Sequence, residues 1–110
     1  MTNLYSQYIK EREEYEYIEI EHGFATYKKI DPDAVYLRDI FVEKEFRKLE
    51  LATKLSNMVA IIAKELGCKK LIGSVCTDAI GVTVSMKALL CDGFQYSHSV
   101  GNMLYFSKVI

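Results

Sequence analysis

Hydrophobic and polar positions along the first thirty residues predict a short helix followed by a hairpin. Apolar and aromatic residues recur at helical spacing in residues 3–13, and Asn3 is a suitable helix cap. The segments YEYIEI (15–20) and GFATYKKI (23–30) alternate apolar and polar positions as strands do. Because they flank a Glu-His-Gly turn, we predict a β-hairpin with Gly23 at the position of positive φ.

A second turn, at DPDA (31–34), leads into the β-branched and aromatic segment VYLRDIFV (35–42). The pattern therefore predicts an antiparallel meander of three strands. From Leu49 to Leu66 the hydrophobic period changes to that of a helix, and Gly67 is a suitable residue to end it.

The rest of the chain predicts a strand, a helix and two closing strands. KKLIGSVC (69–76) is typical of a buried strand, and the helical crossover before it makes it parallel to the third strand. GVTVSMKALLCDG (81–93) predicts a helix, and two strands, FQYSHSV (94–100) and NMLYFSKVI (102–110), follow.

This order of elements predicts one α+β domain over residues 1–110. Its sheet is mixed and mostly antiparallel, with a central parallel strand–helix–strand unit and flanking helices. Ligands of such sheets bind at the carboxyl ends of the parallel strands, beside the N-terminus of the connecting helix.

Composition is that of an ordinary globular domain, because 50% of the 110 residues are hydrophobic and 26% are charged. The net charge of -1 argues against a nucleic-acid partner held by a global positive field. Charge is uneven, however. Residues 43–70 carry seven basic and four acidic side chains, a net of +3, which suits an anion site or a solvated helix face.

Cysteine and histidine usage points to a reducing compartment without a metal site. Cys68, Cys76 and Cys91 are odd in number and lack a CxxC pair, and His22 and His98 have no ligand at suitable spacing. No apolar run reaches membrane-spanning length, and the polar N-terminus is unlike a signal peptide. We therefore expect a soluble cytoplasmic protein with no membrane partner.

The segment VEKEFRKLELATKL (42–55) places a charged loop at the start of the first long helix. The N–H groups at a helix N-terminus can bind a phosphate if small residues let it approach. Ala52 is small and Glu50 is not, and Lys44, Arg47 and Lys48 could add positive charge.

LRDIFVEKEFRKLELATKL (37–55) resembles the cofactor-binding segment of the GNAT superfamily of acyl-CoA-dependent N-acetyltransferases. In that family a strand ending in valine leads to an aromatic–Arg pair and then to Arg/Gln-x-x-Gly-x-Gly/Ala. These places are occupied here by Val42, Phe46, Arg47, Glu50 and Ala52. LLCDGFQ (89–95) is similar to the closing Leu-Gly-Phe element of the family, with Asp92 in place of an apolar residue.

The resemblance, which covers about residues 16–110, implies that acetyl-CoA is the co-substrate. Its pantetheine would lie in a V-shaped gap between the strands that end at Val42 and Cys76. The implied cofactor-binding residues are Ile40, Phe41 and Val42 for the pantetheine, and Arg47, Lys48, Leu49, Glu50, Leu51 and Ala52 for the pyrophosphate. A substrate amine would attack the thioester directly.

Two positions depart from the family pattern. Glu50 replaces a glycine, and its carboxylate would repel the diphosphate unless it swings out or pairs with Lys54. The positive end of the helix dipole could also stabilise this carboxylate. Leu89 stands where a tyrosine often protonates the thiolate, and Val82 where an asparagine is frequent.

Several residues are candidates for catalysis. Tyr96, Cys91 or Ser85 could donate the proton that Leu89 cannot, and the spacing selects none of them. Asp39 could attract a substrate ammonium group, as the resemblance to polyamine-acetylating members implies, or form an ion pair with Arg38. Tyr36 is expected to pack against its neighbours.

The first functional hypothesis is an N-acetyltransferase that transfers an acetyl group to an amine, either exposed on a protein or bound at a site that a homodimer completes. The second is a catalytically degenerate binding or regulatory module of the same fold. The third is an unrelated α+β structural protein.

Overall fold

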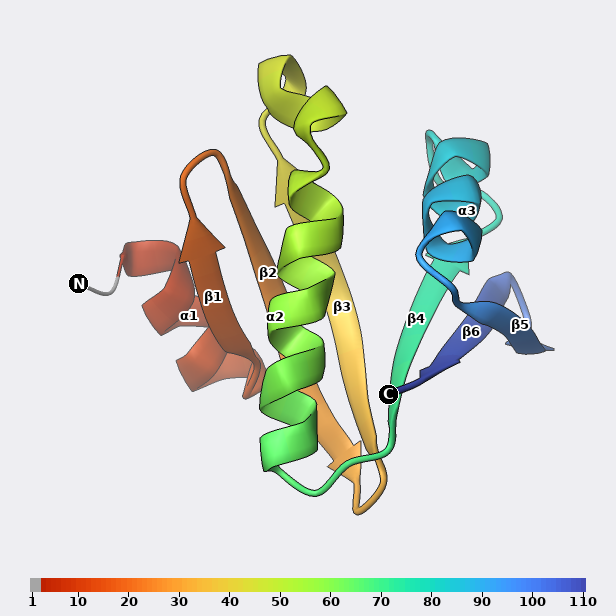
Figure 1. The fold of residues 1–110 in the computed structure, drawn as a ribbon, viewed down its shortest axis with the longest axis horizontal. Coiled ribbons are helices and arrows are strands. Elements are labelled where there is room, and N and C mark those ends of the chain that lie inside the picture. Colours follow the sequence, from red (N-terminus) through yellow and green to blue (C-terminus); the bar gives the residue numbers. More distant parts are fainter. Residues whose placement is uncertain (1–2) are drawn as a thin grey trace.

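The structure is a computed structural model that describes residues 3–110, apart from the side chains of Lys48 and Leu49. Six strands form one sheet in the order β1-β2-β3-β4-β6-β5, in which only β3 and β4 are parallel neighbours. The predicted α+β fold is confirmed (Figure 1). The elements are α1 (Leu4–Glu13), β1 (Glu16–Ile20), β2 (Gly23–Asp31), β3 (Ala34–Val42), η1 (Lys44–Leu49), α2 (Leu51–Glu65), β4 (Lys70–Cys76), α3 (Val82–Cys91), β5 (Gln95–Val100) and β6 (Met103–Val109).

Local signals account for the ends of several elements. The side chain of Asn3 caps α1 by accepting a hydrogen bond from the Ser6 N–H at 2.6 Å, as predicted. In the turn between β2 and β3, the Asp31 carboxylate accepts from the Asp33 N–H at 2.7 Å. The segment before α2, predicted as a charged loop, is the short 3-10 helix η1, so α2 begins at Leu51 rather than Leu49.

The hairpin between β1 and β2 differs from the prediction at its glycine. The residue with positive φ is His22, at 70°, and Gly23 already belongs to β2. A Cβ at Gly23 would lie 2.9 Å from the Phe41 carbonyl oxygen of β3. Glycine is required here for the close approach of two strands, and not for the turn.

The main core lies between α2 and the strands β2 and β3. Leu55, Val59 and Ala63 of α2 are fully buried against residues that include Val35 and Leu37 of β3. Burial of one such leucine or valine side chain stabilises the fold by roughly 1.5–3 kcal/mol. This contact fixes α2, and therefore its N-terminus, on one side of the sheet.

The two parallel strands separate soon after they pair. Their register contains only the pairs Ala34–Lys70, Val35–Leu71 and Tyr36–Ile72. Beyond these pairs the two strands diverge, and α2 and α3 lie over the two sides of the opening (Figure 1). None of the helices in residues 3–110 is long and apolar enough to cross a membrane.

Candidate functional site

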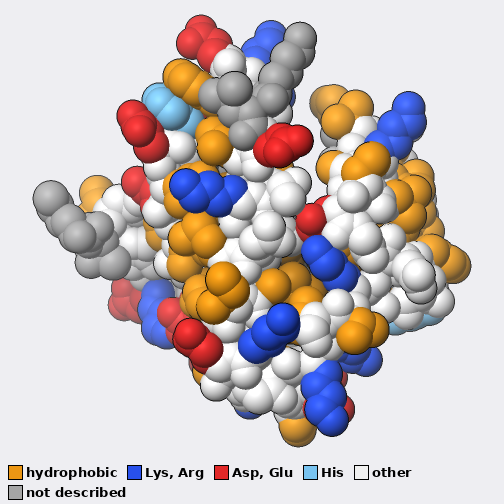
Figure 2. Space-filling view, viewed as in Figure 1, with side chains coloured by type: hydrophobic (Ala, Val, Ile, Leu, Met, Phe, Trp, Pro, Cys, Tyr) orange, Lys and Arg blue, Asp and Glu red, His pale blue; other side chains and the backbone are white. Residues whose placement is uncertain are grey.

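The predicted V-shaped gap is present between residues 37–42 of β3 and residues 73–76 of β4, which we call the strand gap. A cavity of about 650 Å³ opens beside it, within the volume range of ordinary ligand sites. Figure 2 shows the surface hollowed between the parts formed by α2 and α3. The cavity is lined by residues of both strands and both helices, namely Leu37, Arg38, Asp39, Ile40, Glu50, Ala52, Thr53, Ser56, Gly73, Ser74, Val75, Ser85, Ala88, Leu89, Cys91, Asp92 and Phe94.

A β-bulge shapes the β3 wall of the cavity. Tyr27 pairs with Leu37 and Thr26 with Asp39, which leaves Arg38 as the extra residue of β3. Such bulges turn side chains in new directions and are frequent beside active sites. Here the bulge brings both Arg38 and Asp39 to the cavity.

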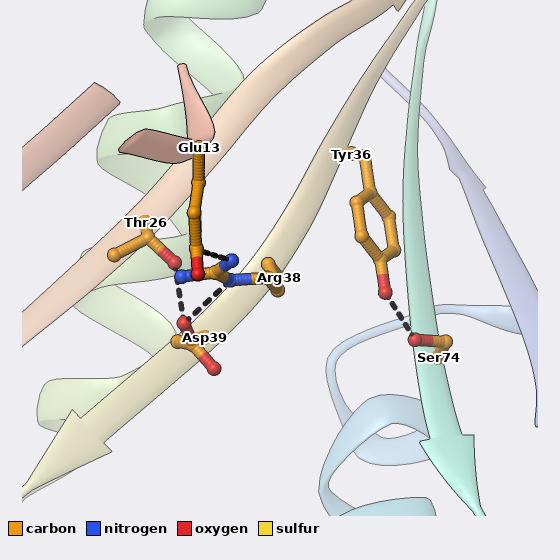
Figure 3. A network of polar contacts seen from close by, with 6 residues as sticks. All are labelled: Glu13, Thr26, Tyr36, Arg38, Asp39 and Ser74. Carbon is orange, nitrogen blue, oxygen red and sulfur yellow. Dashed lines mark hydrogen bonds and ion pairs between the residues drawn. The ribbon is translucent and has the colours of Figure 1, made fainter. Parts of the chain in front are cut away.

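Asp39 belongs to a network of polar contacts (Figure 3). Its carboxylate accepts hydrogen bonds from Thr26 Oγ1 at 2.7 Å and from Arg38 Nε at 2.9 Å, and Arg38 also pairs with Glu13. Burial opposes the charge of Arg38, but the bonds to Glu13 and Asp39 outweigh it and raise the Arg38 pKa. The ion pair with Arg38, one of two alternatives for Asp39, is therefore present, and Asp39 also lines the cavity.

The N-terminus of α2 lies at the cavity and receives no cap from its own side chains. Glu50 is the cap residue, with φ 58° and ψ 26°, and its side chain makes no capping hydrogen bond. No acidic residue occupies the first turn, so the positive end of the helix is open to an anion. Glu50 does not pair with Lys54 or with any other described side chain.

The left-handed conformation of Glu50 explains the glycine of the family pattern. Glycine adopts positive φ without strain, whereas a residue with a Cβ does so at a cost of about 1–2 kcal/mol. The backbone at Glu50 thus has the left-handed turn that favours glycine, although the residue that stands in it is acidic.

Only part of the predicted cofactor-binding set lines the cavity. Ile40, Glu50 and Ala52 do so. Arg47 instead donates from Nε to the Val42 carbonyl oxygen at 2.9 Å, so a carbonyl expected to bind pantetheine already has a partner. The side chain of Phe41 is 46% exposed and contacts Phe24.

Three predicted cofactor-binding residues remain, Lys48, Leu49 and Leu51. Leu51 packs against the core beneath α2. The side chains of Lys48 and Leu49 lie outside the described residues.

His22, for which the sequence suggested no metal-binding partner, supports η1. Its ring stacks on Phe46 with centroids 3.5 Å apart and planes 6° apart, and its Nδ1 contacts the Glu43 carboxylate at 2.5 Å. The turn of the first hairpin thereby holds the loop that leads to α2. Phe46 is the aromatic residue of the family pattern, which gives that position a structural role.

A second polar contact, which the sequence did not reveal, joins α2 to the end of α3. Ser56, only 2% exposed, donates from Oγ to Asp92 Oδ2 at 2.6 Å. Lys108 Nζ lies 3.5 Å from the other carboxylate oxygen of Asp92. The acidic Asp92 in an otherwise apolar closing element was the one available signal for this contact.

The candidate proton donors are distributed unequally. Ser85 and Cys91 line the cavity together with Leu89. Tyr96 lies on β5, is 57% exposed, bonds Ser99 at 2.5 Å and does not line the cavity. Cys91 is exposed, whereas Cys68 is buried.

A further hollow, of about 710 Å³, lies between α1 and β1 and is lined by polar residues such as Asn3, Lys10 and Glu16. It touches neither the strand gap nor the start of α2. Residues 3–110 contain no group of three or more histidine, cysteine or acidic residues that could hold a metal ion.

Comparison with known proteins agrees with this geometry. The sequence matches the acetyltransferase (GNAT) family over residues 4–82. The chain belongs to the GNAT family. Among curated proteins no sequence matches this chain.

Solved structures of acetyltransferases share the fold. The PaiA N-acetyltransferase of Thermoplasma acidophilum, in complex with coenzyme A, is 18% identical with a TM-score of 0.71, over 80% of this chain and 53% of that protein. A GNAT acetyltransferase of Elizabethkingia anophelis with acetyl-CoA bound is 16% identical with a TM-score of 0.69, over 84% and 70%. A proposed acetyltransferase of Agrobacterium tumefaciens is 15% identical with a TM-score of 0.71, over 100% and 95%.

The chain spans only about half the length of the Thermoplasma protein but nearly the whole of the Agrobacterium protein. These likenesses establish the fold. The activity has to be argued from the site.

Proposed function

We propose that this GNAT chain binds acetyl-CoA in the cavity and transfers the acetyl group to an amine. One observation carries the proposal: the strand gap and the uncapped N-terminus of α2 open into the same cavity. A cofactor with a diphosphate at one end and an extended amide chain at the other requires these two features together. The related folds that hold coenzyme A or acetyl-CoA support this assignment.

The described residues fit such a ligand. The N–H groups of the first turn of α2, up to Thr53, would bind the diphosphate, since no side chain caps them. The backbone of β3 near Ile40 would bind the pantetheine, because Ile40 lines the cavity while the Val42 carbonyl is bonded to Arg47. Residues 3–110 would act as one domain around this cavity.

Acetyl transfer requires little covalent chemistry from the protein. The amine nitrogen attacks the thioester carbonyl carbon, the C–N bond forms, the C–S bond breaks, and a proton passes from nitrogen to the thiolate. The chain would position the two reactants and move that proton. Asp39, which faces the cavity, would attract the ammonium form of the acceptor.

Release of free coenzyme A thiol from acetyl-CoA tests the proposal in the presence of an amine panel. The panel contains spermidine, lysine and a lysine-containing peptide, which separate small from peptide acceptors. We expect thiol release that depends on at least one amine. Ala52→Glu, which puts a carboxylate at the start of α2, should abolish it, whereas Asn57→Glu, the same charge on an exposed site of α2 outside the cavity, should not.

A degenerate binding module is the second candidate function. It is favoured by Leu89, which faces the cavity where the family pattern often has a tyrosine, and by the acidic Glu50. In that case acetyl-CoA would bind and no amine of the panel would be acetylated.

A further inference from the structure

Two hydroxyl groups meet across the strand gap at the point where the parallel strands part. Tyr36 is the last residue of β3 in register with β4, and Ser74 lies just beyond its partner Ile72. The Tyr36 hydroxyl and Ser74 Oγ are 2.5 Å apart, and either atom can be the donor (Figure 3). The sequence predicted only that Tyr36 packs against its neighbours, and the structure adds this contact with Ser74.

The two side chains lie on the same face of the sheet, because Tyr36 pairs with Ile72 and Ser74 follows Ile72 by two residues. Ser74 lines the cavity, and Tyr36 does not. The Tyr36 ring instead lies 6.4 Å from the ring of Tyr15, whose neighbours include Arg38. Tyr36 thus lies behind Ser74, outside the cavity that Ser74 lines.

Other hydroxyls of the cavity lack this arrangement. Ser56 donates to Asp92, and the side chains of Thr53 and Ser85 lie on exposed parts of the helices. Leu89, which would be the family's donor position, supplies only a hydrocarbon side chain, and it packs beside Gly73 next to Ser74. Among the described residues that line the cavity, Ser74 is the one hydroxyl backed by a second hydroxyl.

Building on the proposed function, we propose that Ser74, held in place by Tyr36, carries the proton of the reaction from the attacking amine to the departing thiolate. After the C–N bond forms, the positively charged nitrogen gives a proton to Ser74 Oγ, and Ser74 passes its own proton to the sulfur as the C–S bond breaks. The hydrogen bond with Tyr36 orients the Ser74 hydroxyl between the two atoms. Ser74 gains one proton and loses one, so it ends unchanged and no other reactant is needed.

A titration of the bound coenzyme A thiol tests this relay without knowledge of the acceptor. The thiolate absorbs in the ultraviolet, and its appearance with pH is measured in complexes of coenzyme A with the wild type, Ser74→Ala, Tyr36→Phe and the double variant. A hydroxyl that donates to the thiolate stabilises it, so its loss in Ser74→Ala should raise the thiol titration midpoint by about one pH unit. The double variant should shift the midpoint no further than Ser74→Ala alone, because Tyr36 acts only through Ser74.

Ser99→Ala is the matched control, since it breaks the pair between Tyr96 and Ser99 on β5 outside the cavity. Its titration should match the wild type, and Ser74→Thr, which keeps a hydroxyl, should stay close to it. A Ser74→Ala midpoint equal to that of Ser99→Ala would overturn the relay alone. A wild type that binds no coenzyme A would overturn the proposed function, and the relay with it.

Discussion

Helix α2 fully buries Leu55, Val59 and Ala63 against the sheet, whereas α3 has no fully buried side chain. The edge strand β5, which follows α3 in the chain, is likewise exposed at every residue. The two walls of the cavity are therefore built on different principles. The α2 wall is fixed by the hydrophobic core, and the α3 wall by a few contacts, among them that of Asp92 with Ser56.

This contrast suggests a division of work between the two walls. The α2 wall, which would hold the diphosphate end of the ligand, is the closely packed one. The α3 wall is lightly packed, and its residues are freer to vary. Changes in the buried part of α2 should therefore cost far more stability than changes on α3.

Truncation of one leucine on each helix tests the contrast between the two walls most strongly. Leu55→Ala should lower the free energy of unfolding by about 2–5 kcal/mol, because it leaves a cavity under α2. Leu90→Ala on α3 should change it by less than about 0.5 kcal/mol, since the side chain is half exposed. Urea unfolding of both variants measures the difference, and equal losses would break the comparison.

Substitution of alanine for two strand glycines, Gly23 beside the α2 wall and Gly73 beside α3, should sharpen the comparison of the two walls. At Gly23 the new Cβ meets the Phe41 carbonyl oxygen at 2.9 Å, and rigid backbone cannot yield, so we expect a loss of roughly 1–3 kcal/mol. At Gly73 the new Cβ meets a Leu89 methyl group at 3.0 Å, and that side chain can turn into the cavity. The cost there should be below about 1 kcal/mol, with the cavity made smaller.

The cost at Gly73 should also disappear when Leu89 is shortened. We expect Gly73→Ala combined with Leu89→Ala to be no less stable than Leu89→Ala alone, in thermal unfolding of the single and double variants. A Gly73→Ala loss as large as that of Gly23→Ala would show that the α3 wall is packed as tightly as the α2 wall.

The contact between the two walls should have a smaller effect. Ser56→Ala removes a hydrogen bond to Asp92, which keeps its contact with Lys108, so the loss should be about 1 kcal/mol. Ser85→Ala, at an exposed serine of the same cavity, should cause no loss. If the two variants unfold at the same temperature, the contact does not hold the walls together.

The order of elements was predictable because it rests on local signals. Apolar periodicity marked α2, turn residues such as Pro32 and Asp33 marked the meander, and Asn3 marked the start of α1. The positive φ of His22 was missed because Gly23 is needed for a neighbour in β3 that the local sequence does not reveal.

The site was predicted only where it follows the family pattern. The strand gap and the backbone turn at Glu50 fall into this class. The contacts Arg38–Glu13, Ser56–Asp92 and Tyr36–Ser74 join residues 25, 36 and 38 positions apart, so no local spacing signals them. Only the tertiary fold brings these groups together.

A substitution of Glu50, at the start of α2, should have only a small effect on stability. Glu50→Gly removes both a carboxylate from the cavity and the strain of a side chain at φ 58°. Its effect on stability should be a gain of no more than about 1 kcal/mol, because the relief of strain is offset by the flexibility of glycine in the unfolded chain. Its main effect should be on the affinity for an anion.

Calorimetric titration of coenzyme A into the wild type, Glu50→Gly and Glu45→Gly tests the central claim, that the start of α2 and the strand gap form one coenzyme site. We expect saturable binding by the wild type, binding roughly fivefold tighter by Glu50→Gly, and no such gain for Glu45→Gly, which removes a carboxylate of η1 outside the cavity. Absence of binding at millimolar coenzyme A by all three proteins would contradict the claim.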